Sequence, residues 1–263
     1  LGFGKTSQRV LLPSFLAAYK GRSAEKISLS AFRDVPIPNW QLKYTGFMNF
    51  KWVQKRFKRF SLTHVYLSSY TINQFRSNLD LAPDFTEGGL RPGEPYENQD
   101  LGNVLDQSGN FKNRQLLSNI NLEEQFSPLF RLDFEMKNSV KILAEMRRDR
   151  VLSLSFDNNL LTEIRGNEYI LGIGYRIKDF RIRSKLAGPK QVIKSDLNMK
   201  LDASVRNNKT IIRYLDVENN QITQGQTIWG VRYTADYAFT QNLTAIFYFD
   251  YTFSEFEIST AFP

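Results

Sequence analysis

Hydrophobic and polar residues alternate along most of the second half of the chain. The first clear stretch alternates apolar with charged residues: Leu132, Phe134 and Met136 with Arg131, Asp133, Glu135 and Lys137. The alternation continues at 140–156, 169–177, 197–206, 229–239 and 243–253. A period of two is typical of a β-strand whose two faces meet different surroundings. This half is therefore predicted to be all-β.

The pattern divides into predicted strands at about 128–137, 140–157, 168–178, 180–187, 193–206, 209–217, 227–239 and 243–258. Short polar joints at Lys137-Asn138, Lys178-Asp179, Asn207-Asn208 and Thr240-Gln241 alternate with longer joints at 158–167, 188–192 and 218–226. In an up-and-down antiparallel sheet, this order collects the tight turns at one edge and the longer loops at the other. Outer-membrane barrels have that arrangement.

Strand length separates two kinds of β protein. Val140–Phe156 would extend roughly 56 Å at ~3.3 Å per residue. Strands of soluble sandwiches usually have ~3–10 residues, and a tilted strand crosses a bilayer with ~9–11. The lengths and the aromatic residues on the apolar faces favour a transmembrane antiparallel β-barrel over a soluble β-sandwich adhesin or binding module. The charged faces favour a water-filled lumen, because burying them in a dry core is costly.

A barrel of this kind gives the two faces of each strand opposite surroundings. The residues predicted to face the lumen are Arg131, Asp133, Glu135, Lys137, Lys200, Asp202, Arg232 and Asp236. The residues predicted to face lipid are Leu132, Phe134, Trp229, Tyr233, Tyr237, Phe247, Phe249 and Tyr251.

The first half of the chain is less regular. It predicts a short strand near Trp40, Leu42 and Tyr44, and further strands at about 60–75 and 115–125. Residues 47–59 predict a basic helix, lying either at a membrane surface or in solvent as a connection. The stretch 80–114 is rich in Gly, Pro, Asp and Asn and predicts a long polar loop. Residues 1–263 would thus supply about ten or eleven strands.

The composition excludes or disfavours several kinds of membrane segment and catalytic site. No apolar run approaches the ~18–20 residues of a membrane helix, and the net charge of +8 favours anionic surroundings. The absence of cysteine and the single histidine, His64, disfavour thiolate, zinc and Ser-His-Asp sites. No motif predicts a catalytic residue, a metal site or a cofactor. The cations alternate with carboxylates and form no basic, aromatic stripe, which argues against nucleic acid.

Five stretches resemble the C-terminal region of the SprA/Sov family, the outer-membrane translocons of the Bacteroidetes type IX secretion system. They are Val35–Gly46, Phe60–Ile72, Glu124–Leu129, Tyr169–Tyr175 and Phe249–Pro263. The resemblance implies a pore that exports folded cargo, including gliding adhesins, across the outer membrane. It implies that these ten or eleven strands are one wall segment of a larger barrel. It also implies a PorV-like shuttle barrel, a plug protein and cargo carrying a C-terminal signal as partners. A smaller porin or nutrient-transporter barrel is the alternative within membrane proteins.

Overall fold

The computed structural model describes residues 3–27, 30–32, 37–79, 111–113, 115–183, 192–217, 219–240 and 242–257. Most of them belong to one antiparallel sheet of eight strands, in the order β1-β2-β5-β6-β7-β8-β9-β10. Its strands are β1 (Trp40–Tyr44), β2 (Phe57–Asn73), β5 (Asn119–Met136), β6 (Val140–Ser155), β7 (Leu160–Arg183), β8 (Val192–Tyr214), β9 (Asn219–Thr240) and β10 (Leu243–Glu257). A separate pair joins β3 (Arg76–Ser77) to β4 (Gln115–Leu116). The predicted all-β class is confirmed.

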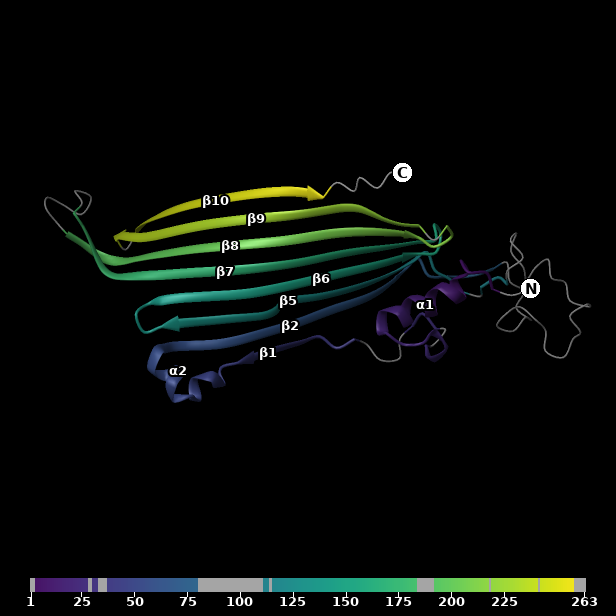
Figure 1. The fold of residues 1–263 in the computed structure, drawn as a ribbon, viewed down its shortest axis with the longest axis horizontal. Helices are drawn as coiled ribbons and strands as arrows, with labels where there is room; N and C mark the ends of the chain where they lie inside the picture. The colour runs from purple at the N-terminus through teal and green to yellow at the C-terminus, as the bar shows by residue number, and fades with distance from the viewer. Residues whose placement is uncertain are drawn as a thin grey trace, which may run out of the picture.

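The sheet is long and open (Figure 1), with β1 at one edge and β10 at the other. From β5 onward each strand pairs with the next one along the chain, so this part of the sheet is built from successive hairpins. Apart from β1, the strands of this sheet have 15 to 24 residues. Such lengths exceed the ~3–10 residues usual in soluble domains. The length of β6 agrees with the prediction at 140–157, whereas β7, β8 and β9 are longer than predicted.

The two strands predicted at 168–178 and 180–187 fall on the single strand β7, and those predicted at 193–206 and 209–217 fall on β8. The expected break at Asn207-Asn208 lies inside β8, where Asn207 pairs with Asn167 on one side and Thr227 on the other. Pairing on both sides holds this segment extended and overrides its local preference for a turn. The break expected at Lys178-Asp179 is a bulge inside β7, where Asp179 has φ 55°. The alternation of tight turns with longer joints was therefore wrong, because the joints predicted at 158–167 and 218–226 are mostly strand.

The basic helix is shorter than predicted. A 3₁₀ turn, η2, covers Gly46–Asn49 and the helix α2 covers Lys51–Arg56, whereas Phe57 already begins β2. Phe57 and Arg59 pair with Met136 and Glu135 of β5, and this pairing ends the helix. The long polar loop predicted at 80–114 lies outside the described residues, except for 111–113.

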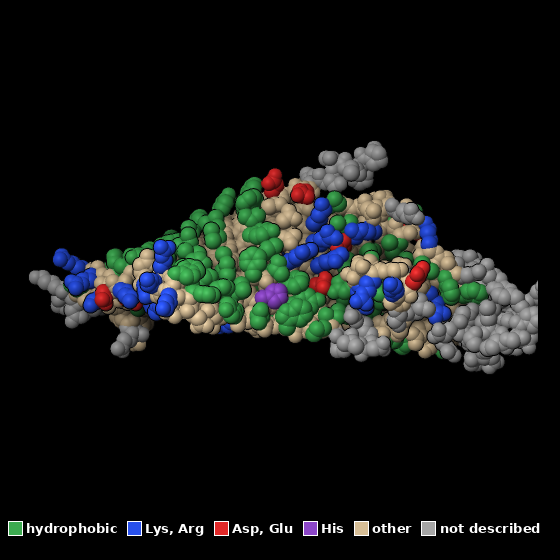
Figure 2. All heavy atoms as spheres, turned by 60° about the horizontal axis from the view of Figure 1, so that its bottom comes forward, with side chains coloured by type: hydrophobic (Ala, Val, Ile, Leu, Met, Phe, Trp, Pro, Cys, Tyr) green, Lys and Arg blue, Asp and Glu red, His purple; other side chains and the backbone are tan. Residues whose placement is uncertain are grey.

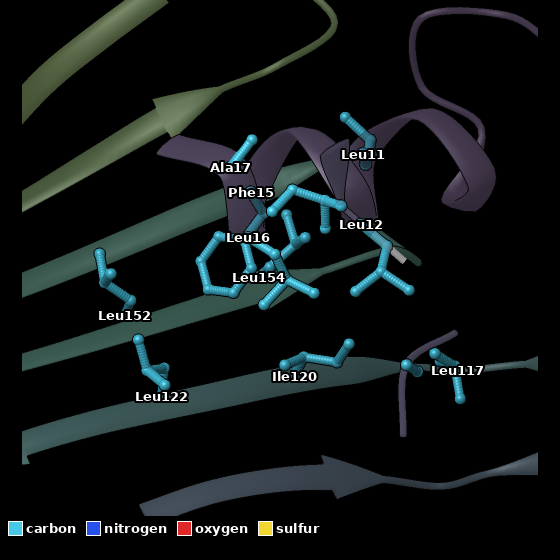
Figure 3. Close-up of a cluster of buried hydrophobic side chains, with 12 residues drawn as sticks. Leu11, Leu12, Phe15, Leu16, Ala17, Leu117, Ile120, Leu122, Leu152 and Leu154 are labelled. Atoms are coloured by element: carbon cyan, nitrogen blue, oxygen red, sulfur yellow. The ribbon is translucent and has the colours of Figure 1, made fainter. Parts of the chain in front are cut away.

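The helix α1 (Gln8–Lys20) covers one end of the sheet, followed by the 3₁₀ turn η1 (Ala24–Lys26). Its apolar residues recur on one face and pack against apolar side chains of β5 and β6 (Figure 3). The helix contributes Leu11, Leu12, Phe15, Leu16 and Ala17, and the sheet contributes Ile120, Leu122, Leu152 and Leu154. Gly21, in the left-handed conformation at φ 62°, ends α1. We call this group the α1 cluster.

Candidate functional site

One face of the sheet carries apolar side chains in register across all eight strands. A complete row contains directly opposed residues from β1 to β10: Tyr44, Leu62, Leu132, Ala144, Leu171, Ala203, Val231 and Tyr251. The next row toward α2 begins at β2 with Phe60, Phe134, Ile142, Ile173, Leu201, Tyr233 and Phe249. The next row toward α1 contains Phe130, Met146, Tyr169, Val205, Trp229 and Phe253. Together with the two shorter rows that follow Tyr175 and Ile177, we call these residues the apolar belt.

Large side chains of the apolar belt are uncovered. Leu171 is 52% exposed, Trp229 48% and Phe249 53%. Figure 2 shows hydrophobic side chains gathered over the middle of this face, with Lys and Arg toward both ends. Soluble monomers rarely expose a contiguous apolar surface of more than a few hundred Å². A surface that crosses eight strands therefore marks a contact with another apolar phase.

The width of the belt matches a bilayer. Along β7 it runs from Tyr169 to Ile177, a length of roughly 30 Å at ~3.3 Å per residue. A tilted membrane strand needs ~9–11 residues. Tyr169 and Trp229 lie in the outermost row on the α1 side, and Tyr175 lies toward the other margin. Amphipathic rings at both margins are typical of membrane–water interfaces.

Cations lie immediately beyond the belt. On the α1 side, register places Arg148, Arg150, Arg165 and Lys209 on the belt's own face, in the two rows after Met146 and Tyr169. At the opposite end, α2 carries the exposed side chains of Lys51, Lys55 and Arg56. Positive charge at a membrane margin is attracted to anionic headgroups.

Glu163 lies between this cationic margin and the α1 cluster. Its carboxylate is 2.8 Å from Arg150 Nε, 2.5 Å from Arg165 Nε and 2.9 Å from Arg213 Nη1, and its side chain is 1% exposed. A buried carboxylate needs such donors to offset its lost hydration. Glu163 thereby ties β6, β7 and β8 together at the point where the belt ends.

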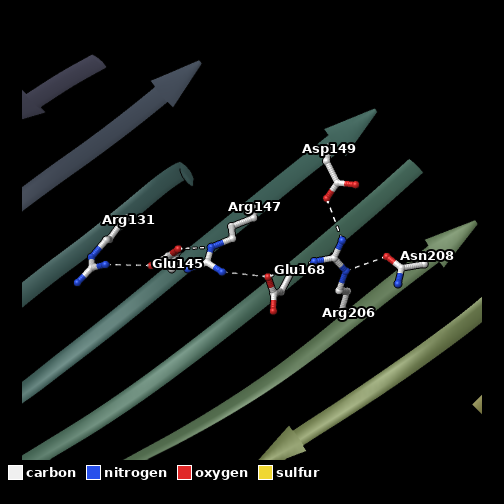
Figure 4. A network of polar contacts seen from close by, with 7 residues as sticks. All are labelled: Arg131, Glu145, Arg147, Asp149, Glu168, Arg206 and Asn208. Atoms are coloured by element: carbon white, nitrogen blue, oxygen red, sulfur yellow. Dashed lines mark hydrogen bonds and ion pairs between the residues drawn. The ribbon is translucent and has the colours of Figure 1, made fainter. Parts of the chain in front are cut away.

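The opposite face of the sheet is polar and ionic. Figure 4 shows a chain of ion pairs that crosses β5, β6, β7 and β8. In order, it links Arg131 to Glu145 (3.4 Å), Glu145 to Arg147 (2.5 Å), Arg147 to Glu168 (3.3 Å), Glu168 to Arg206 (3.9 Å) and Arg206 to Asp149 (3.3 Å). Arg59–Asp133 extends the pattern toward β2, and Lys200–Asp202 and Arg232–Asp250 extend it toward β10. We call this surface the polar face.

A hollow of about 400 Å³ lies on the polar face, and Gly172 and Gly174 are among its lining residues. A Cβ added to Gly172 would lie 2.5 Å from Asp202 Oδ1, so the absent side chain makes room for the aspartate of the next strand. Gly166 makes room for Asp149 in the same way. Charged side chains line the hollow: Arg59, Arg131, Asp133, Lys141, Arg176, Lys200 and Asp236.

The register separates the two sets of residues that the sequence assigned to opposite faces. Arg131, Asp133, Glu135, Lys200, Asp202, Arg232 and Asp236 lie on the polar face, and Lys137 lies just after β5. Leu132, Phe134, Trp229, Tyr233, Tyr237, Phe247, Phe249 and Tyr251 lie on the belt side. Tyr237 differs from the others because it is 4% exposed. Its hydroxyl lies 3.0 Å from the carbonyl oxygen of Phe180 and 3.1 Å from that of Ile193.

Sequence reasoning missed the Glu163 cluster and a second polar contact beneath α1. There, Tyr19 of α1 and Tyr66 of β2 both donate to Glu124 Oε1, at 2.5 and 2.9 Å. Burial, followed by the hydrogen bond to Glu124, raises the pKa of Tyr19 well above its ordinary value. One signal was present in the sequence: Arg148 and Arg150 occupy apolar positions of the alternation after Met146. Two cations out of phase mark the margin of the belt.

No other chemistry emerges from the part of the chain that the structure describes. There, no group of three or more His, Asp or Glu side chains could hold a metal ion. The described helices include none with the length and apolar character needed to cross a membrane. His64 bonds through Nδ1 to the backbone carbonyl of Leu129. Among known proteins, no family model and no curated sequence matches the chain.

Proposed function

We propose that this chain is a wall segment of an outer-membrane β-barrel, with the apolar belt toward acyl chains and the polar face toward a hydrated lumen. The observation that carries the proposal is the belt itself, which crosses eight strands and leaves large apolar side chains about half exposed. Acyl chains are the apolar phase that fits its roughly 30 Å length, its aromatic margins and its flanking cations.

The polar face suits a wet interior. Arg131 and Arg147 are 41% exposed and share the nearly buried Glu145, so charge of one sign is compensated by its neighbours. Mixed charge across β5 to β8 offers a passing protein little to bind. Exposed ion pairs contribute only ~0–1 kcal/mol each, which leaves this surface free to exchange its partners for water.

The open sheet favours a wide barrel. Within the described residues β1 and β10 do not pair with each other, although eight strands are already present. Eight strands suffice to close a small barrel filled by its own side chains. A wall that remains open at this strand number fits a larger ring, which in turn fits a pore for folded proteins better than a small porin or nutrient transporter.

With the resemblance to the SprA/Sov family, these features support a protein-conducting translocon of type IX secretion. Its partners would be outer-membrane lipid, a PorV-like shuttle barrel, a plug protein and cargo with a C-terminal signal, and its export would support gliding motility. The wall residues perform no bond chemistry in this role. They hold the lumen open and hydrated.

Spin labels test the orientation of the two faces. Because the chain has no cysteine, single cysteines at Tyr233 and Phe247 on the belt, and at Lys200 and Asp236 on the polar face, can each carry a nitroxide. In the membrane, belt labels should relax with oxygen and polar-face labels with a water-soluble nickel chelate. Belt labels that report water, or shielding from both reagents as inside a sandwich core, would overturn the membrane proposal.

Secretion and conductance test the pore. In cells whose outer membrane retains the full-length protein, removal of the β9–β10 hairpin should abolish cargo export. The double variant Lys200→Leu/Asp202→Leu makes the polar face more hydrophobic without removing a strand, and it should slow export. The matched pair Leu201→Ile/Ala203→Val on the belt should leave it near normal. A small, porin-like conductance after plug removal would contradict a pore for folded proteins.

A further inference from the structure

A hollow of about 410 Å³ interrupts the apolar belt on its α1 side. It exists because Ala144 and Ala203 are small, while larger side chains surround them. Its walls include Phe130, Tyr169 and Trp229, and its lining is almost wholly apolar. The hollow reaches the outermost row of the belt, which is one row from Arg148 and two rows from Lys209.

The cations at that end are not fully paired. Arg148 lies two residues beyond Met146, about 7 Å along β6, and Lys209 lies opposite Arg165. In the part of the chain that the structure describes, neither Arg148 nor Lys209 forms an ion pair or hydrogen bond through its side chain. Arg150, Arg165 and Arg213 share the single carboxylate of Glu163. Besides Glu163, these rows hold the carboxylates of Glu124, opposite Arg150, and of Glu255 and Glu257 on β10. Among the described residues, none of these carboxylates forms an ion pair with Arg148 or Lys209.

We propose that this place binds one anionic glycerophospholipid, with an acyl chain in the hollow and the phosphate between Arg148 and Lys209. The inference rests on the proposed membrane role and adds a specific lipid site to it. The apolar hollow matches the acyl chain of such a lipid, and the cations beyond it match the anionic headgroup. Asn167 and Asn207, in the row of Arg148, lie beside the phosphate position as further polar groups.

Charge decides which lipid is preferred. Near a membrane surface, each Lys or Arg contributes ~1 kcal/mol toward an anionic lipid, or about a fivefold preference. A zwitterionic phosphatidylethanolamine presents an ammonium group that the same cations repel. The hollow alone would accept the acyl chain of any phospholipid. The cations therefore make the site selective for anionic lipid.

Photocrosslinking in the full-length protein tests the site. The substitution Tyr169→p-benzoylphenylalanine places a photoreactive ring at the wall of the hollow, in nanodiscs of equal parts phosphatidylglycerol and phosphatidylethanolamine. We expect roughly 25-fold more phosphatidylglycerol than phosphatidylethanolamine in the adduct, or about fivefold for each of Arg148 and Lys209. Arg148→Gln/Lys209→Gln should reduce this ratio about fivefold for each cation removed. The control Lys137→Gln/Lys141→Gln removes the same charge from the polar face and its turn, and should leave the ratio unchanged.

Each outcome bears on one proposal. Lipid adducts in proportion to the nanodisc composition, unchanged by Arg148→Gln/Lys209→Gln, would overturn the lipid site and leave the membrane role intact. The absence of any lipid adduct would overturn the membrane role itself. Ala203→Leu, which fills the hollow, should lower the phosphatidylglycerol yield without changing the charge, and an unchanged yield would contradict binding in the hollow. Adducts of lipid A, rather than glycerophospholipid, in intact cells would also overturn the assignment.

Discussion

The same face of the sheet carries two apolar surfaces, and the chain covers only one of them. At the α1 cluster, Ile120, Leu122 and Leu154 are at most 1% exposed, because α1 lies on them. In the apolar belt, Leu171, Ile173 and Leu201 are between 46% and 52% exposed, and nothing in the described chain lies on them. Both surfaces have the same alternating pattern in sequence.

The difference indicates which part of each strand needs a covering helix. Burying an apolar side chain contributes ~1.5–3 kcal/mol, so a strand end that projects into water gains from a covering helix. The belt receives no such helix, although α1 and α2 lie near its two ends. A bilayer would cover the belt without any protein element, and the cationic margin around Arg148 and Arg165 lies where the two surfaces meet.

Truncating one leucine on each surface gives the largest expected difference. Leu154→Ala leaves a cavity beneath α1 and should lower the free energy of unfolding by ~2–5 kcal/mol. Leu201→Ala should cost only about 1 kcal/mol, because acyl chains fill the space and only part of the transfer free energy is lost. Denaturant titration in lipid nanodiscs measures both. Equal losses of the larger size would mean that the belt, too, is packed against protein.

A charge on the belt separates lipid from water. Ile173→Arg, in the middle row, should destabilise the protein in a bilayer by ~2–4 kcal/mol. Thr234→Arg adds the same side chain to the polar face and should change stability by no more than about 0.5 kcal/mol. The same titration, with membrane fractionation of cells, compares the two. If Ile173→Arg is as harmless as its control, the belt faces water and the comparison fails.

The smallest expected effect concerns the tyrosine beneath α1. Because burial and Glu124 raise the pKa of Tyr19, the folded state keeps its phenol proton at pH values where the unfolded state, with an ordinary pKa of 10.0, has lost it. This stabilisation is complete below about pH 10 and declines above it, by at most about 1.4 kcal/mol per pH unit. Tyr19→Phe should therefore flatten the loss of stability between pH 10 and 11.

A second tyrosine serves as the control for that measurement. Tyr248 is 75% exposed on the polar side of β10, so Tyr248→Phe should leave the pH profile of stability as it is. A wild-type slope in Tyr19→Phe would show that folding does not raise the pKa of the phenol under α1.

Much of the site could be read from the sequence, because the side-chain period of a strand is fixed. Alternation at Leu132, Phe134 and their successors assigns residues to two faces, and pairing in register preserves those faces across the sheet. The positions of the turns were harder to predict from the sequence. The Asn207-Asn208 pair has the composition of a hairpin turn, yet both neighbouring strands pair with it, and a single sequence does not state which neighbours a segment will have.

The sequence by itself determined the all-β class and the two-faced character of the sheet, since these follow from local periodicity. Only the tertiary structure decided which apolar residues α1 covers, how Glu163 gathers three arginines from β6, β7 and β8, and where a hollow meets a cationic margin. The physical reason is separation along the chain. Tyr19 and Glu124 are 105 residues apart, and no local pattern encodes a contact between them.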